Sequence, residues 1–316
     1  MTAKTDRLVT LFGGGGFIGR YVAQHLFKAG MRVRVAERDT RNAYFLRPLT
    51  GLGMIQFVDA DIRRPETVAR AVDGAEAVIN LVGTLKGDFQ GIHVAGARNV
   101  AEAAAATGAR TLVQVSAIGA DPESESEYGR TKSEGELAVR AAFPDAVVVR
   151  PSIVFGPEDD FVNRFAGMAR MLPVLPVIRG AWKLQPVYAG DLGRAIAAAA
   201  VEPEAHRGRT YELGGPNPLS MREINHWLCQ ATGRGSKPIL DVPDGLGRLM
   251  ARLFGWLPGA PITWDQWLML QKDNVPSGNQ PGFEAFGINP QPLAAVAEGW
   301  LPLYRRHGRW AAPSPY

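Results

Sequence analysis

The sequence predicts an α/β protein built on a doubly wound parallel sheet, with a smaller lobe toward the C-terminus. Two observations support this fold class. In the first half of the 316-residue chain, short β-rich segments alternate with amphipathic helical segments, as in βαβ units. After Pro151, prolines and glycines become frequent and the regular alternation stops. Right-handed crossovers leave few topologies for the first half, and the doubly wound sheet is the commonest of them.

The alternating segments are assigned in chain order from their composition and spacing. Aliphatic and β-branched runs predict strands at 8–12, 32–36, 54–58, 77–81, 111–115 and 146–149. Apolar residues at helical spacing predict helices at 18–29, 65–72, 94–107, 125–142, 192–201 and 221–231. Ser220 is expected to cap the last of these helices, with Glu223 at the capping-box position. We expect residues 1–155 and 184–202 to form the sheet domain, and residues 156–183 and 203–316 the smaller lobe.

Composition excludes several classes of protein. The single cysteine, Cys229, rules out an internal disulfide, and the five histidines show no ligand spacing, so no metal site is expected. Cys229 lies in an apolar helical run, which predicts a buried thiol. A net charge of +4 without a dense basic block makes nucleic acid an unfavoured partner. No apolar run reaches the roughly 18 residues of a membrane-spanning helix. A strand from Arg7 would leave no room for a targeting peptide, so we expect a soluble chain or one attached to a membrane surface.

A glycine-rich turn between the first strand and the first helix is the strongest local signal. Gly13, Gly16 and Gly19 follow the strand directly and run into the helix. Gly13 permits the tight turn, Gly16 lets the backbone approach a pyrophosphate, and Gly19 permits close helix–strand packing. The free N–H groups and the dipole at a helix N-terminus favour bound phosphate. The turn therefore predicts a Rossmann-type dinucleotide-binding domain.

The end of the second strand is expected to meet the adenosine ribose. Glu37 is placed to bind the ribose diol and would favour NAD, whereas Arg38 is placed to bind a 2′-phosphate and would favour NADP. Only one of the two side chains can face the ribose, and a solvated charge cluster is the third alternative. Asp61, after the third strand, is expected at the adenine edge.

A tyrosine and a lysine follow the fifth strand. Tyr128 and Lys132 are four residues apart, so they share one face of the predicted helix. A neighbouring ammonium would lower the pKa of the phenol and equip it to move a proton during hydride transfer.

Together these motifs resemble the short-chain dehydrogenase/reductase superfamily, in its extended and atypical branches of the NAD-dependent epimerase/dehydratase type. The likeness continues in four ordered segments, at 115–119, 150–157, 185–191 and 213–216. The segment 30–39 resembles the atypical branch, in which the arginine binds the NADP phosphate. The resemblance implies NADP(H) as cofactor, held between the two parts of the chain. The implied contacts are Gly13, Gly15, Gly16, Phe17, Ile18, Gly19, Arg38, Asp61, Ile62, Leu81, Val82, Ser116, Tyr128, Lys132, Pro151 and Ser152.

One departure from the superfamily concerns catalysis. Extended members carry a catalytic Ser or Thr about two positions after the first Ser at the end of the fifth strand. Here Ser116 opens that run and Ile118 stands at the catalytic position. Isoleucine cannot donate a hydrogen bond to a substrate oxygen, so the Ser–Tyr–Lys set is incomplete. Tyr128 and Lys132 are either the catalytic pair or residues that only bind the nicotinamide ribose.

Two segments, 142–166 and 183–188, resemble more closely the nucleotide-binding accessory subunit family of respiratory complex I (NADH:ubiquinone oxidoreductase). It implies a structural NADPH and partner subunits where the peripheral arm meets the membrane. The implied location is the cytoplasmic side of a bacterial inner membrane, or the mitochondrial matrix side for a processed chain. The alternatives are an NADP-dependent reductase or epimerase acting on a small carbonyl or nucleotide-sugar substrate, and a redox sensor that binds NADP(H) without chemistry.

The segment 246–257 carries Leu, Met, Phe and Trp at helical spacing, with Arg248 and Arg252 among them. A basic, Trp-bearing amphipathic helix lies on a membrane surface or docks into a partner groove. The alternative is that this apolar stripe belongs to the core of the smaller lobe.

Overall fold

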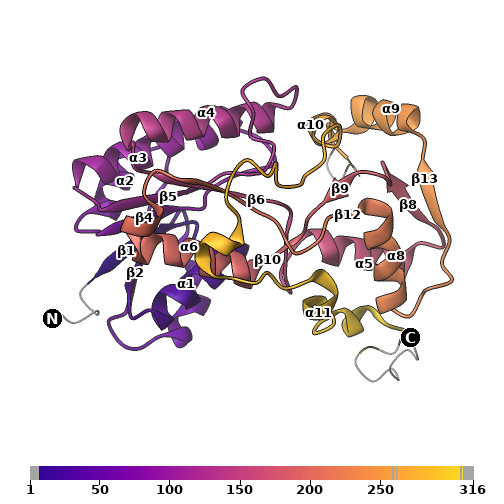
Figure 1. The fold of residues 1–316 in the computed structure, drawn as a ribbon, viewed down its shortest axis with the longest axis horizontal. Helices are drawn as coiled ribbons and strands as arrows, with labels where there is room; N and C mark the ends of the chain where they lie inside the picture. Colours follow the sequence, from indigo (N-terminus) through magenta and orange to yellow (C-terminus); the bar gives the residue numbers. More distant parts are fainter. Residues whose placement is uncertain (1–6, 258–259, 261, 307, 309–316) are drawn as a thin grey trace. The chain divides into compact units, whose positions relative to one another are not determined.

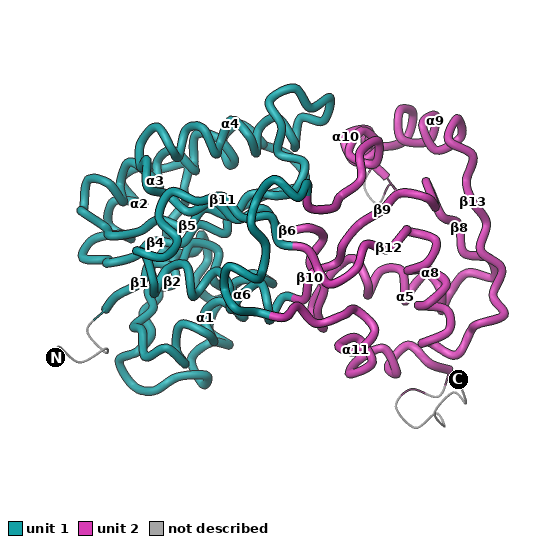
Figure 2. The backbone as a smooth tube through the Cα atoms, viewed as in Figure 1, with its two compact units in different colours: residues 1–151, 189–213, 277–288 teal, residues 152–188, 214–276, 289–316 magenta. Residues whose placement is uncertain are grey.

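The computed structural model describes residues 7–257, 260, 262–306 and 308. The chain forms two compact units, shown in different colours in Figure 2. Unit 1 comprises residues 1–151, 189–213 and 277–288, and unit 2 comprises residues 152–188, 214–276 and 289–316. Within the described residues, no helix combines the length and the apolar character needed to span a bilayer.

Unit 1 is built on a seven-stranded parallel sheet with the order β11-β6-β5-β4-β1-β2-β3. Its strands are β1 (Leu8–Phe12), β2 (Arg32–Glu37), β3 (Ile55–Asp59), β4 (Ala77–Asn80), β5 (Thr111–Val115), β6 (Val147–Pro151) and β11 (Thr210–Leu213). The chain runs outward from β1 to β3 and then returns to the other side of β1 for β4. In a doubly wound sheet a ligand binds at this reversal, outside the carboxyl ends of the strands. The predicted α/β fold class is confirmed.

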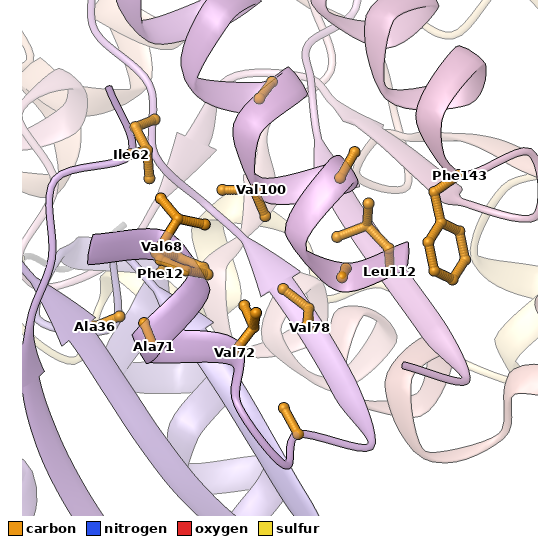
Figure 3. Close-up of a cluster of buried hydrophobic side chains, with 14 of the residues drawn as sticks. Phe12, Ala36, Ile62, Val68, Ala71, Val72, Val78, Val100, Leu112 and Phe143 are labelled. Atoms are coloured by element: carbon orange, nitrogen blue, oxygen red, sulfur yellow. The ribbon is translucent and has the colours of Figure 1, made fainter. Parts of the chain in front are cut away.

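Helices cover both faces of this sheet, as Figure 1 shows. On one face lie α1 (Phe17–Lys28) and α6 (Ala189–Val201), and on the other α2 (Pro65–Val72), α3 (Ala97–Ala106) and α4 (Glu127–Ala142). Further helical segments are η2 (Thr40–Leu49), η3 (Gln90–Gly96), α7 (Pro203–His206) and η4 (Phe283–Phe286). A core of small and branched side chains fills the space under α2, α3 and α4, including Phe12, Val78, Val100 and Leu112 (Figure 3). The many alanines of α3 let it approach the sheet closely.

Unit 2 contains short strands and helices around its own core. The strands are β7 (Val154–Phe155), β8 (Leu175–Ile178), β9 (Lys183–Leu184), β10 (Val187–Tyr188), β12 (Leu219–Ser220) and β13 (Ile239–Val242). The helices are α5 (Phe161–Met171), α8 (Met221–Ala231), α9 (Asp244–Phe254), α10 (Trp264–Met269), α11 (Leu293–Ala297) and η5 (Leu301–Tyr304). The expected capping box of Ser220 and Glu223 opens α8, and Cys229 is a buried thiol in that helix. Phe155, Ile224, Leu228 and Leu301 form part of this core.

The two units differ from the expected boundaries in four segments. Residues 203–213 join unit 1 because β11 pairs with β6 at the edge of the sheet. Residues 277–288 also join unit 1, since the Glu212 carboxylate accepts the Ser277 N–H at 2.6 Å and Phe286 stacks on His206 with ring centroids 4.5 Å apart. Residues 152–155 and 184–188 belong to unit 2, where β7 pairs with β10. These long-range contacts leave no periodic signal in the sequence.

Candidate functional site

The glycine-rich turn joins the carboxyl end of β1 to the start of α1. Gly13 has a φ of +80°, a left-handed conformation that favours glycine. Its N–H donates to the Ala36 carbonyl at 3.2 Å, and its own carbonyl accepts the Gly16 N–H at 3.1 Å. Gly16 is the N-cap of α1, in extended conformation and with no side chain capping the helix. The first N–H groups of α1 are therefore free of a side-chain cap, an arrangement that suits a bound anion.

The remaining glycines of the turn differ in how much room they leave. A Cβ on Gly19 would lie 2.3 Å from the Gly13 carbonyl oxygen, so only glycine lets α1 lie against the turn. A Cβ on Gly14 would lie 2.9 Å from a methyl group of Val35. A Cβ on Gly16 would meet one atom only, the Gly13 carbonyl oxygen at 3.3 Å. Gly14 and Gly19 thus serve the fold, whereas Gly16 leaves an exposed backbone surface that a ligand can approach. Phe17 and Ile18, the first two residues of α1, are half-buried behind it.

Glu37 and Arg38, at the end of β2, are in different surroundings. The Glu37 carboxylate accepts the Gly15 N–H at 2.6 Å, and burial raises the pKa of this carboxyl group although that hydrogen bond opposes the rise. Arg38 is exposed and makes no ion pair with a described residue. The structure therefore brings Glu37 to the glycine turn and leaves the Arg38 guanidinium available to an anion.

Four of the expected cofactor contacts lie around the ends of β3 and β4, among them Asp61, which was expected at the adenine edge. Asp61 is bound by the Arg63 guanidinium at 2.6 Å, and these hydrogen bonds lower the pKa of Asp61 to about 2. The buried Ile62 is fixed through its carbonyl, which accepts from the Asn99 amide at 2.8 Å. Leu81 and Val82 follow β4 directly, and a Cβ on Gly13 would lie 3.3 Å from the Leu81 Cβ. Leu81 and Val82 are therefore next to the glycine turn, as the strand order requires.

Tyr128 and Lys132 lie one turn apart on α4, with the Lys132 Nζ 5.8 Å from the centre of the Tyr128 ring. Lys132 is buried and donates to the Val115 carbonyl at 3.3 Å. Burial lowers the pKa of Lys132 to about 8, although Glu136 opposes the shift. An ammonium has three donors, so this buried group retains hydrogen-bonding capacity for a ligand hydroxyl.

The end of β5 carries a buried hydroxyl beside this pair. The Ser116 Oγ is buried and has no hydrogen-bond partner among the described residues. Two residues on, Ile118 is buried and its N–H donates to the carbonyl of Pro151, the last residue of β6, at 3.0 Å. Ser152 belongs to unit 2, where its Oγ lies 2.7 Å from the Asn274 Oδ1 and accepts the Gln185 N–H. Of these expected contacts, Ser116 keeps an unused hydroxyl, whereas the Ser152 hydroxyl is already satisfied.

His93 is a residue of this region to which sequence reasoning gave no role. It lies in the π-helical turn η3, its ring stacked on Phe89 and edge-on to Tyr128 with centroids 5.5 and 5.4 Å apart. Its Nε2 accepts the Thr84 N–H at 3.1 Å, so Nδ1 carries the proton and donates to the Thr131 Oγ1 at 3.0 Å. Burial, aided by the Lys132 charge, lowers the pKa of His93 to about 3.

His93 therefore acts as a neutral support for the segment that follows β4. A Cβ on Gly83 would lie 3.1 Å from the Lys132 Nζ and 3.8 Å from the His93 Nε2, so both side chains meet this segment. No spacing in the sequence links residues 83–84 to 93 and 132. A histidine inside an otherwise apolar helical run was the only available signal.

These features fit a bound dinucleotide. The turn offers uncapped N–H groups to phosphate, and Arg38 offers a guanidinium without an ion pair to a described residue. Ser116 and Lys132 offer hydrogen-bonding capacity at the end of β5. Among the residues that the structure describes, no three His, Cys, Asp or Glu side chains gather as metal ligands.

Comparison with known proteins identifies the family. Residues 9–214 match the model of the NAD dependent epimerase/dehydratase family. The chain belongs to this family.

Two curated relatives and one solved structure are informative. This chain is 34% identical over 313 residues to a rat protein named NADH dehydrogenase (ubiquinone) 1 alpha subcomplex subunit 9, mitochondrial. The match covers 96% of this chain and 81% of the rat protein. This chain is also 34% identical over 202 residues to the ceramide reductase of Caulobacter vibrioides, covering 63% of this chain and 62% of that protein. An Escherichia coli NADPH-dependent quinone oxidoreductase, solved with NADPH, superposes with a TM-score of 0.75 over 92% of this chain and 99% of the other, at 19% identity. That likeness shows the fold alone.

Proposed function

We propose that this protein is an NADP(H)-binding accessory subunit of respiratory complex I, in which the cofactor serves mainly as a structural element. The observation that carries the proposal is the 34% identity with the rat complex I subunit over 96% of this chain. The match extends through unit 2, beyond residues 9–214 that the epimerase/dehydratase family shares. If this chain and the rat protein shared only a cofactor-binding domain, no similarity between them would be expected in residues 215–316.

The choice of NADP(H) rests on Arg38. Its guanidinium is exposed at the end of β2 and forms no ion pair with a described residue, although its charge acts on the carboxylates of Glu37 and Asp61. It can therefore hold a 2′-phosphate by two parallel hydrogen bonds. The Glu37 carboxylate, which would favour NAD, is already bound to the Gly15 N–H. The opposite choice requires the second carboxylate oxygen of Glu37, Oε2, to accept from the ribose hydroxyls while Oε1 keeps the Gly15 N–H.

A structural role for the cofactor follows from the residues at the end of β5. When bound, the nicotinamide ring can accept or donate hydride. Ile118 occupies the position at which a Ser or Thr would orient a substrate oxygen, and it is buried. Tyr128 and Lys132 remain, and both suit the hydroxyls of the nicotinamide ribose. The site is therefore better equipped to retain a dinucleotide than to turn over a carbonyl substrate.

The partners in this proposal are complex I subunits at the junction of the peripheral arm and the membrane. The corresponding location is peripheral, on the cytoplasmic face of a bacterial inner membrane or the matrix face in a mitochondrion. To test this, a tagged chain is purified from its native membranes in mild detergent and the accompanying proteins are identified. We expect complex I subunits in stoichiometric amounts, and their absence would contradict the proposal.

A second candidate function is an NADP-dependent reductase. It is favoured by the 34% identity with ceramide reductase and by the retention of Tyr128 and Lys132 on one face of α4. In this case Tyr128 would donate the proton and the substrate would be a carbonyl on a ceramide-like lipid. Turnover of such a lipid with NADPH that disappears in Tyr128→Phe would establish the reductase.

A further inference from the structure

Helix α9 has an unusual distribution of side chains for a helix in a folded unit. Its buried residues are the small ones, Gly247 and Ala251. A Cβ on Gly247 would lie 2.8 Å from the ring of Trp267 in α10, and Ala251 packs with Ile262 and Trp267. The close packing is therefore made by the small residues.

The leucines of α9 point the other way. Leu246, Leu249 and Leu253 are each about half exposed, and the residues just after them include Trp256, which is 78% exposed. We call this surface the α9 face; it consists of Leu246, Leu249, Leu253, Phe254, Trp256 and Leu257. Large apolar residues that are exposed together in this way mark an interaction site. The stripe recognised in the sequence is thus exposed and is not part of the core.

Between residues 245 and 257 the charged side chains are all of one sign. Arg248 and Arg252 are four residues apart, so they line one edge of the face, and both are exposed without an ion pair to a described residue. No Asp or Glu occurs between residues 245 and 257. The acidic residue of α9, Asp244, is paired with Arg179 at 3.2 Å.

We infer that the α9 face docks on the surface of a bilayer that contains anionic lipids. An apolar helix face with arginines along its edge and a tryptophan beside it is the arrangement of an interfacial helix, with the cations at the level of the lipid phosphates. Eleven residues extend about 16 Å, roughly half of a hydrocarbon core, so α9 would lie in the interface and not cross it. The inference goes beyond the proposed function because it concerns unit 2 alone and needs no other subunit.

The test is cosedimentation of the purified full-length protein with vesicles. One set of vesicles is phosphatidylcholine, and the other is an equal mixture of phosphatidylcholine and phosphatidylglycerol. We expect binding to the mixed vesicles and much weaker binding to phosphatidylcholine alone. Changing Leu253, Phe254 and Trp256 together to Ser should reduce binding by more than about tenfold. Arg248→Ala and Arg252→Ala should each reduce it about fivefold, and only with the anionic vesicles.

Met171→Ser is the matched control, because Met171 in α5 of the same unit is 77% exposed and lies outside the α9 face. Its vesicle binding should equal that of the wild type. Unchanged melting temperatures would show that the variants are folded, and the arginine variants test the inference even if the triple variant does not fold.

Two outcomes would overturn the inference. The first is a wild-type protein that does not bind anionic vesicles. If such a protein instead forms a dimer that the triple variant disrupts, the α9 face is a contact between two copies of this chain. The second is equal binding by the wild type and the triple variant. Vesicle binding without copurification of complex I would sustain this inference and refute the proposed function, whereas the reverse result would refute only this inference.

Discussion

Replacing Gly16 with aspartate should abolish cofactor binding while leaving the fold intact. Gly16 has a φ of −77° and a ψ of 178°, a conformation open to any residue, and its Cβ would meet a single atom at 3.3 Å. Aspartate is a preferred N-cap and its charge suits a helix N-terminus. Together these effects should stabilise the ligand-free protein by about 0.5–1 kcal/mol. The same carboxylate would stand where the pyrophosphate must approach the N–H groups of α1.

The expected result is therefore opposite in sign for the free and the ligand-bound protein. With NADPH at about 100 times its Kd, the wild type should gain about 2.7 kcal/mol, which corresponds to roughly 4 °C in Tm for a chain of this size. Gly16→Asp should show a Tm about 1 °C above the wild type without ligand, and no rise when NADPH is added. Differential scanning fluorimetry measures both quantities in one experiment.

Gly19→Ala is the matched variant for this experiment. Its Cβ would lie 2.3 Å from the Gly13 carbonyl oxygen and 2.6 Å from the Gly14 Cα, so it should lower the stability of the free protein by about 1–3 kcal/mol. If Gly16→Asp still gains Tm from NADPH, or if it destabilises the free protein as much as Gly19→Ala does, the turn is not a phosphate cradle.

Three further predictions concern the same site. Arg38→Ala should remove the larger rise in Tm that NADPH gives over NADH, whereas equal rises with both nucleotides in the wild type would mean that Glu37 faces the ribose. Lys132→Ala should weaken NADPH retention and Tyr128→Phe should change it little. Because the pKa of Lys132 is about 8, the affinity of the wild type for NADPH should be constant below that pH and decline above it, as the ammonium loses its charge. An affinity that does not change with pH in titrations would contradict the role of Lys132. His93→Leu should cost about 1–3 kcal/mol by leaving the Thr84 N–H without its acceptor. The pKa of His93 is about 3 in the folded protein and 6.5 ordinarily, so between these pH values only the unfolded chain binds a proton at His93. The stability of the wild type should therefore fall as the pH drops below about 6.5. Denaturant titrations should show a shallower fall for His93→Leu.

The cofactor domain was predictable from the sequence because its order is local. β1 was predicted at its observed bounds, and the helix assigned to 65–72 matches α2 (Pro65–Val72). These elements alternate regularly, and each has an apolar pattern of its own period. Gly13 and Gly19 were correctly singled out, since their conformation and close packing require glycine.

The features that escaped prediction depend on contacts between distant residues. The association of residues 277–288 with unit 1 rests on Glu212, and the role of His93 rests on Thr84 and Thr131. For the 246–257 segment, periodicity revealed the apolar stripe but not whether it faces the core. The small residues Gly247 and Ala251 decide this point, because they permit the close approach of α10 on the opposite side. A pattern of hydrophobic residues alone carries no such information.

In the proposed function, a bound dinucleotide, and not its chemistry, is what this protein needs in order to be incorporated into complex I. The direct measurement is the amount of this chain in complex I isolated on native gels from membranes of strains carrying the wild type, Gly16→Asp or Tyr128→Phe. We expect normal incorporation for the wild type and Tyr128→Phe, and loss of the chain from the complex for Gly16→Asp. Absence of the wild-type chain from complex I, or equal loss of both variants, would contradict the proposed function.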